Sequence, residues 1–153
     1  MPNSCNILYD LAGMSQPTST ACWATAFAMV INQRNYTSYT PEDIATSIGR
    51  DLNSYGSPDS DERAVANEYN LSFSFVRVDD IDQFAMLLSS KGPLYVTPDN
   101  TDHCVVVFGL RHDEDGTQWQ LYDPWKGEAP ITVSKLKQAL DTLDDTSSVG
   151  VYA

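Results

Sequence analysis

The sequence has few basic residues for its length. It contains 9 lysine and arginine side chains against 21 aspartate and glutamate side chains, for a formal net charge of −12 over 153 residues. No lysine or arginine occurs before Arg34. Because an acidic surface repels phosphate groups, we expect no nucleic-acid partner.

Long apolar runs are also missing. The longest, Ala26 to Ile31, is far shorter than the roughly 20 residues that a helix needs to cross a bilayer. The N-terminal residues lack the basic start and apolar core of a secretory signal. We therefore expect no membrane partner and no classical export.

Cysteine is scarce as well. Cys5, Cys22 and Cys104 stand 17 and 82 residues apart, an odd number with no CxxC spacing for a zinc or redox site. This set favours a reducing compartment or an unpaired, reactive thiol.

The order of the expected elements indicates the fold class. The sequence shows no internal repeat and no low-complexity tract, so we expect a single domain over residues 1–153. Helices are predicted at 21–34, 41–49, 59–69 and 80–91, and a last one, capped by Ser134, over Leu136, Leu140 and Leu143; strands are predicted at 71–78, 94–97, 103–110, 118–123 and 149–152. Helices first and an antiparallel sheet second predict an α+β fold.

Cys22 begins the first predicted helix, after a segment in which Pro17 and hydroxyl residues break or cap the chain. The unsatisfied N–H groups and the positive end of the helix dipole favour a thiolate there. The alternative is a small, buried and unreactive residue of an apolar helix.

His103 and Asp123 are expected to meet at one end of a hairpin. His103 opens the most apolar strand, and Asp123 ends the strand that returns from the turn near residue 114. Asp123 shares the apolar face of its strand, where a carboxylate needs a partner. A thiol, an imidazole and a carboxylate together can supply a nucleophile, a base and an orienting group. The alternative is that the two residues have separate structural roles, Asp123 as a capping aspartate and His103 as a histidine at a strand edge.

Two further side chains fit such a site. Gln16, six residues before Cys22, could donate its amide to an oxyanion together with the Cys22 N–H. Trp125 could cover the imidazole and the carboxylate from water. Alternatively, Gln16 is an ordinary polar loop residue and Trp125 is a core tryptophan.

Three segments carry a resemblance to a known family. Residues 16–24 resemble the Gln-x5-Cys-Trp-Ala segment of papain-like cysteine peptidases, and residues 103–109 resemble their His-x-Val-x-Val-x-Gly strand. Tyr122-Asp123-Pro124-Trp125 resembles the Asp-Pro-Trp block of the compact bacterial branch. That branch includes effector proteases and is similar to the peptidase domains of bacteriocin and peptide exporters.

The resemblance implies a papain-like fold, in which the nucleophile helix packs on a C-terminal antiparallel sheet, and a hydrolase that needs no metal and no cofactor. It also implies roles for four residues: Cys22 as nucleophile, His103 as base, Asp123 as orienting group and Gln16 in the oxyanion hole. We further expect Trp125 and Trp23 to shield and support the site. Exporter peptidases generally have glycine where this chain has Trp23, so a double-glycine preference stays open.

We therefore expect a cysteine endopeptidase that acts on a protein substrate. Without a visible prodomain, signal or tether, it fits a cytoplasmic protein, or a bacterial effector or toxin delivered to a target cell by a specialised secretion system. A toxin would require an immunity protein, whose basic surface would suit the charge of −12.

Three other functions remain open at this stage. The same trio could serve a deamidase or transglutaminase that acts on protein glutamine. A non-catalytic binding module could keep the fold with an unreactive Cys22. Cys22, His103 and Asp123 are also an acceptable ligand set for zinc.

Overall fold

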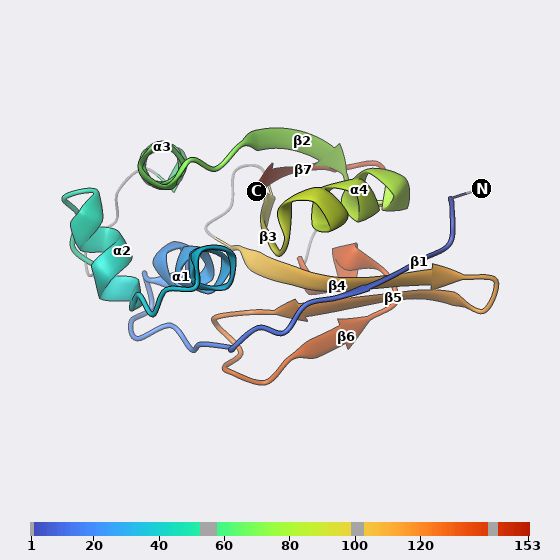
Figure 1. Ribbon diagram of the computed structural model, residues 1–153, viewed down its shortest axis with the longest axis horizontal. Coiled ribbons are helices and arrows are strands. Elements are labelled where there is room, and N and C mark those ends of the chain that lie inside the picture. The colour runs from blue at the N-terminus through green and yellow to red at the C-terminus, as the bar shows by residue number, and fades with distance from the viewer. Residues whose placement is uncertain (1, 53–57, 99–102, 141–143) are drawn as a thin grey trace.

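The computed structural model describes residues 2–52, 58–98, 103–140 and 144–153 (Figure 1). Over these residues the chain forms a seven-stranded antiparallel sheet with helices on both of its faces. The predicted α+β class is confirmed.

Helix α1 (Cys22–Asn35) is buried on nearly all sides, and its residues 24–31 are inaccessible to solvent. The sequence prediction of 21–34 is correct to one residue at each end. The residue before the helix provides no side-chain cap. The hydroxyls of Thr18 and Thr20 donate instead to the carbonyl of Leu52. The positive end of the dipole of α1 therefore lies at Cys22, where it favours negative charge.

The other three helices also lie within two residues of their predicted bounds: α2 (Pro41–Ser47), α3 (Pro58–Tyr69) and α4 (Ile81–Lys91). The Thr40 hydroxyl accepts from the Asp43 N–H, and the Asp43 carboxylate accepts from the Thr40 N–H, which forms a reciprocal cap. Asp80 caps α4 by accepting from the Gln83 N–H. Local capping chemistry accounts for these starts.

The strands do not lie in the sheet in the order of the chain. The sheet runs β2-β7-β3-β4-β5-β6, with β1 also paired to β4. Their bounds are β1 (Cys5–Leu8), β2 (Phe73–Arg77), β3 (Leu94–Pro98), β4 (Val105–Asp113), β5 (Gly116–Tyr122), β6 (Ile131–Val133) and β7 (Ser148–Tyr152). The last strand of the chain therefore lies inside the sheet, between β2 and β3.

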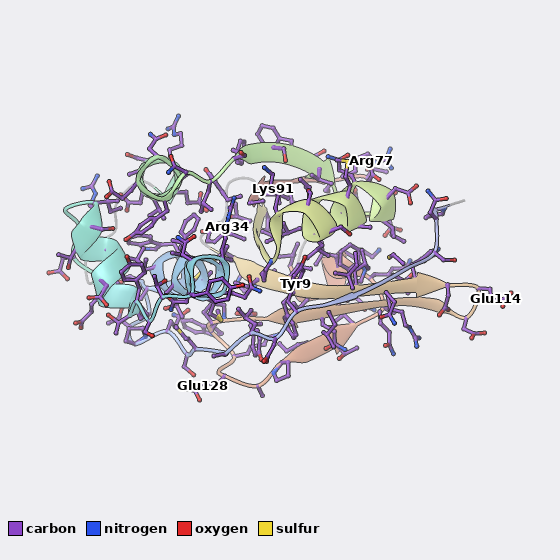
Figure 2. All side chains as sticks on the ribbon, in the orientation of Figure 1. Tyr9, Arg34, Arg77, Lys91, Glu114 and Glu128 are labelled. Atoms are coloured by element: carbon purple, nitrogen blue, oxygen red, sulfur yellow. The ribbon has the colours of Figure 1, made fainter. Side chains whose placement is uncertain are left out.

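Strand β1 was not predicted. It pairs with residues Gly109 to His112 of β4, beyond the part of β4 that pairs with β3. The close approach needs a glycine, because a Cβ on Gly109 would lie 2.8 Å from Cδ1 of Leu8 and 3.1 Å from the Ile7 carbonyl oxygen. Beyond β1, Tyr9 donates its hydroxyl to the Leu88 carbonyl of α4 (Figure 2).

The helix predicted after Ser134 is wrong in type and length. The chain forms β6, which was not predicted, and then a single 3₁₀ turn, η1 (Leu136–Ala139). The Gln138 side-chain oxygen accepts from the backbone N–H of both Ser134 and Lys135, which caps the start of this turn. The predicted helical residue Leu143 lies outside the described residues.

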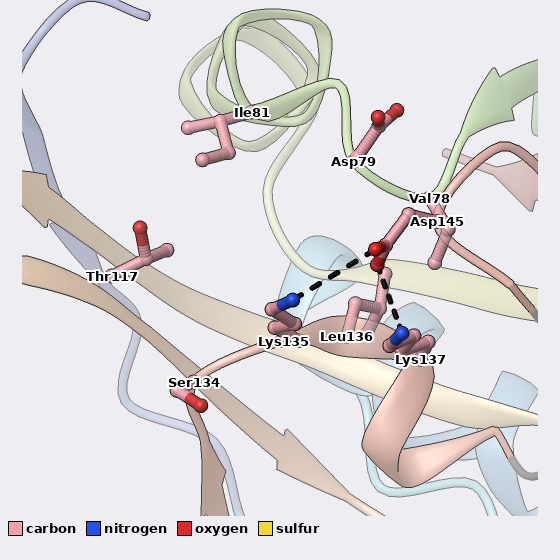
Figure 3. A pocket seen from close by; sticks show the side chains of 9 residues that line it. All are labelled: Val78, Asp79, Ile81, Thr117, Ser134, Lys135, Leu136, Lys137 and Asp145. Carbon is pink, nitrogen blue, oxygen red and sulfur yellow. Dashed lines mark ion pairs between the residues drawn. The ribbon is translucent and has the colours of Figure 1, made fainter.

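Ion pairs hold η1 against the segment that leads into β7. Asp145 is 3.8 Å from Lys135 and 3.1 Å from Lys137, measured between the carboxylate oxygens and the ammonium nitrogens (Figure 3). These pairs are exposed, so they add little stability. The end of η1 lies close to the start of β4, since the Ala139 carbonyl oxygen is 3.2 Å from Nε2 of His103.

The sheet separates two hydrophobic cores. One core contains α1, with Tyr95, Val106 and Tyr122 from the sheet. The other contains α4 and η1, with Val105 and the remaining inward-facing strand residues. Alternate residues of β3 and β4 therefore face opposite cores. Within the described residues, no helix is both long and apolar enough to cross a bilayer.

Candidate active site

Cys22 is the first residue of α1, at the rim of the core between α1 and the sheet. Its side chain is 9% exposed. Its sulfur lies 2.7 Å from the sulfur of Cys104, the residue directly before β4. Helix α1 thus places Cys22 against the start of β4, at Cys104, which directly follows His103.

His103 and Asp123 lie at the same end of the sheet because β4 and β5 form a hairpin. The register pairs Val106 with Tyr122, so the residues just before β4 and just after β5 are neighbours. Nε2 of His103 lies 3.3 Å from Oδ2 of Asp123 and 3.2 Å from the Ala139 carbonyl oxygen. The imidazole is therefore held by Asp123, directly after β5, and by the last residue of η1.

Asp123 is 2% exposed, and both of its oxygens have partners. Oδ2 faces His103, and Oδ1 accepts from the Trp125 N–H at 3.0 Å. A buried carboxylate of this kind is costly unless it is paired, and here it is paired on both sides.

The two tryptophans differ in exposure. The side chain of Trp125 is 66% exposed, and its bond to Asp123 comes from its backbone. Shielding by the Trp125 ring stays a prediction. Trp23 is partly buried and packs against the core that contains α1, and its supporting role also stays a prediction.

Several effects act on the pKa of the Cys22 thiol, and together they lower it. The largest is the S–H of Cys104, which donates to the Cys22 sulfur. Burial opposes it, while the positive charge on His103 and the backbone N–H of Cys104 lower the pKa further. The site therefore favours a thiolate at Cys22.

The pKa of His103 is raised, chiefly by its hydrogen bond to Asp123 and against the effect of burial. The negative charges of Asp123 and Cys22 act in the same direction. The two shifts favour one state, a thiolate beside an imidazolium, over a wider pH range than isolated groups would allow.

Gln16 lies on the loop that approaches α1 and is tied to the Asp123 segment. Its backbone N–H donates to the Pro124 carbonyl at 3.1 Å, and its side-chain Nε2 donates to the Thr18 carbonyl at 2.9 Å. The amide nitrogen carries two hydrogens, so the bond to Thr18 leaves one that could serve an oxyanion. Its Oε1 is buried and has no hydrogen-bond partner among the described residues.

The sequence reasoning missed a buried polar chain behind Cys22. The Tyr95 hydroxyl donates to Oε2 of Glu62 at 2.5 Å, and Tyr95 also bonds to Cys104, which contacts Cys22. The pKa of Tyr95 is raised well above its usual range, first by burial and then by the charges of Cys104 and Glu62. The position of Cys104 directly after His103, on the strand face opposite Val105, was the only signal for it.

The arrangement does not favour a metal. Among the residues that the structure describes, no group of three or more His, Cys, Asp or Glu side chains is placed to hold an ion. Cys22, His103 and Asp123 therefore find no geometric support as zinc ligands.

Solved structures with similar folds include peptidases and peptidase domains. The double-glycine motif protease of an AMS/PCAT transporter, solved with a leader peptide, is 18% identical at a TM-score of 0.59, with 97% of each chain covered. A C39-like peptidase from Bacillus anthracis is 14% identical at a TM-score of 0.62, with 97% of this chain and 98% of that chain covered. The Streptococcus ComA peptidase domain is 15% identical at 0.59, with 93% and 97% covered.

Because these sequence identities are 18% or lower, the structural matches show a shared fold alone. Comparison with curated protein sequences gives no match. The model of the family described as papain-like cysteine protease AvrRpt2 matches residues 5–141, which is most of the chain. The chain therefore belongs to this family of papain-like cysteine proteases, which are hydrolases.

Proposed function

We propose that the protein is a cysteine endopeptidase with a Cys22-His103-Asp123 triad in a single catalytic domain. The observation that carries the proposal is the 3.3 Å pairing of His103 Nε2 with the buried Asp123 carboxylate. This pairing engages Nε2 and orients the imidazole, so Nδ1 is the nitrogen that we assign to proton exchange with the thiol. The lowered pKa of Cys22 and its place at the start of α1 support the same roles.

The chemistry runs through a thioester. The Cys22 thiolate adds to the carbonyl carbon of the scissile peptide bond, and the carbonyl oxygen becomes an oxyanion. The His103 imidazolium gives its proton to the leaving amine as the C–N bond breaks. Water, deprotonated by His103, then attacks the thioester and releases the acid and Cys22. Asp123 stabilises the imidazolium throughout.

The oxyanion is stabilised by two donors, the Cys22 backbone N–H and the Gln16 side-chain amide. Both belong to the turn of chain that enters α1, so the oxyanion would form at the positive end of the helix. The bond from Gln16 to Thr18 fixes the amide before substrate arrives, which reduces the reorganisation needed in the transition state.

The substrate is a peptide segment of a protein. A similar structure, the double-glycine motif protease, contains a bound leader peptide. The charge of −12 suits basic partners, and an effector or toxin of this kind would meet an immunity protein with a basic surface.

Mass spectrometry of protein termini tests the proposal. A cell extract is incubated with the wild-type protein or with Cys22→Ala, and new N-termini are compared. We expect new termini with the wild type only. A mass increase of about one dalton on glutamine residues, without new termini, would identify a deamidase, which uses the same thioester. No change in either would identify a binding module.

Gln16→Ala should lower kcat by roughly 10² to 10³ with little change in KM, because the oxyanion exists only after attack. The measurement is steady-state cleavage of a peptide identified from the new termini. Labelling of Cys22 by iodoacetamide forms no oxyanion at a carbonyl, so its rate should stay near the wild-type value.

Gln118→Ala is the matched control, since Gln118 is an exposed glutamine on β5. It should cleave at the wild-type rate. If Gln16→Ala lost labelling and cleavage equally, Gln16 would be a structural residue of the loop. If Gln16→Ala cleaved normally, another donor would occupy the oxyanion hole.

A further inference from the structure

The nucleophile of the proposed mechanism has a second thiol as its neighbour. The sulfurs of Cys22 and Cys104 lie 2.7 Å apart, although 82 residues separate them in the chain. A disulfide bond measures about 2.05 Å, so the two thiols need to approach by only roughly 0.7 Å to be joined. Both are present as thiols in this structure.

The two thiols differ in a way that suits stepwise oxidation. Cys22 is at the rim of the core and has a lowered pKa, chiefly because of the Cys104 S–H. Cys104 is 1% exposed, and burial raises its pKa well above the usual range. An oxidant that reaches the site should therefore react first with Cys22, and Cys104 should stay reduced until Cys22 has changed.

The backbone around both sulfurs is well held. Cys104 directly precedes β4, whose residues 105–107 pair with β3. Cys22 is fixed at the start of the buried helix α1. Behind Cys104, Tyr95 is anchored by its hydrogen bond to Glu62 and by stacking on Phe27. This packing keeps the Cys22 and Cys104 sulfurs close to each other.

We propose that Cys22 and Cys104 form a reversible disulfide when the protein meets a peroxide, and that this bond turns off the peptidase. The loss of activity rests on the proposed role of Cys22 as nucleophile. Formation of the disulfide does not rest on that role.

The chemistry balances in two steps. The Cys22 thiolate attacks a peroxide oxygen, so that an S–O bond forms, the O–O bond breaks, and Cys22 becomes a sulfenic acid while hydroxide leaves. The Cys104 sulfur then attacks the Cys22 sulfur, an S–S bond forms, and the sulfenic oxygen leaves with the Cys104 proton as water. Once Cys22 is no longer a thiolate, one cause of the raised pKa of Cys104 is gone.

Peptide mapping by mass spectrometry tests the proposal on the whole chain. The reduced protein is treated with hydrogen peroxide, remaining thiols are alkylated, and peptides are analysed without reduction. We expect a linked pair of peptides that contain Cys22 and Cys104, a mass loss of about 2 Da, and alkylation at Cys5. Cys5 serves as an internal control, since its sulfur contacts the Leu110 carbonyl at 3.8 Å on another part of β4.

Cys104→Ser is the matched variant, because serine keeps a hydrogen-bond donor and cannot form the bond. After peroxide it should gain oxygen at Cys22 in steps of about 16 Da, and dithiothreitol should not restore its activity once the sulfinic acid has formed. The wild type should regain most of its own starting activity under the same treatment. Each protein is compared with its own untreated sample.

Oxygen added at Cys22 of the wild type, with Cys104 still open to alkylation, would overturn the proposal. The mapping needs no substrate, so it stands even if the protein proves not to be a peptidase or if Cys104→Ser fails to fold. A disulfide that forms without any loss of cleavage would overturn the proposed role of Cys22 as well as its regulation.

Discussion

Replacing Cys22 by alanine should lower the rate of substrate cleavage by at least about 10⁴-fold, because the thioester of the proposed mechanism forms on the Cys22 sulfur. Cleavage of the identified peptide measures the loss. The fold should persist, since the change removes one sulfur at the rim of the core. Circular dichroism and thermal unfolding check that point.

Cys5→Ala is the matched control for this variant. Cys5 lies on β1, and burial raises its thiol pKa. Its replacement should leave cleavage at the wild-type rate. Cleavage by a folded Cys22→Ala protein at a rate near that of the wild type would remove Cys22 from the mechanism.

Asp123→Ala should lower kcat/KM by about 10³ to 10⁴ and leave measurable residual activity, because Asp123 orients His103 and does not bond to the substrate. The change also removes the largest cause of the raised pKa of His103. The alkaline limb of the pH–rate profile, where the imidazolium loses its proton, should therefore move to lower pH.

Asp123→Asn separates orientation from charge. The amide oxygen can still accept from His103, so cleavage should recover by at least about tenfold over Asp123→Ala. The alkaline limb should remain at lower pH, since the negative charge is gone. If Asp123→Ala cleaved as fast as the wild type, another residue would hold the imidazole.

Local chemistry made the helices predictable. Thr40, Pro41 and Asp43 form a helix-capping pattern that is visible in the sequence of α2. Asp80 is the corresponding capping residue of α4. The meeting of His103 with Asp123 was also predictable, because a hairpin turn near residue 114 dictates which strand ends are neighbours. These features depend on short separations along the chain.

Features that depend on distant segments were not predictable in the same way. Strand β1 is four residues long and is defined by its pairing with β4, more than 100 residues away. The position of β7 between β2 and β3 depends on long-range tertiary packing, and no local sequence pattern predicts it. The 3₁₀ turn η1 ends at Ala139, although Ser134 and the spacing of Leu136 and Leu140 predicted an amphipathic helix there.

Cys104 illustrates the same limit within the candidate site. Its alternation with Val105 shows that the two face opposite sides of β4, and the sequence predicts that Cys104 is buried. Its contact with Cys22 requires knowing that α1 packs on that face of the sheet. The place of Cys22 at the start of α1 could therefore be predicted, whereas its contact with Cys104 could not.

The pH dependence of Cys22 labelling tests most directly whether Cys22 and His103 form a thiolate and imidazolium. Iodoacetamide reacts with the thiolate, so the labelling rate rises with pH through the pKa of Cys22. Because that pKa is lowered, wild-type Cys22 should label at neutral pH well before Cys5 or Cys104, with its midpoint below the ordinary cysteine value of about 8.5. His103→Ala, which removes a positive neighbour, should move the midpoint to higher pH. A wild-type midpoint at or above the ordinary value, with equal labelling of all three cysteines in the folded protein, would contradict the account.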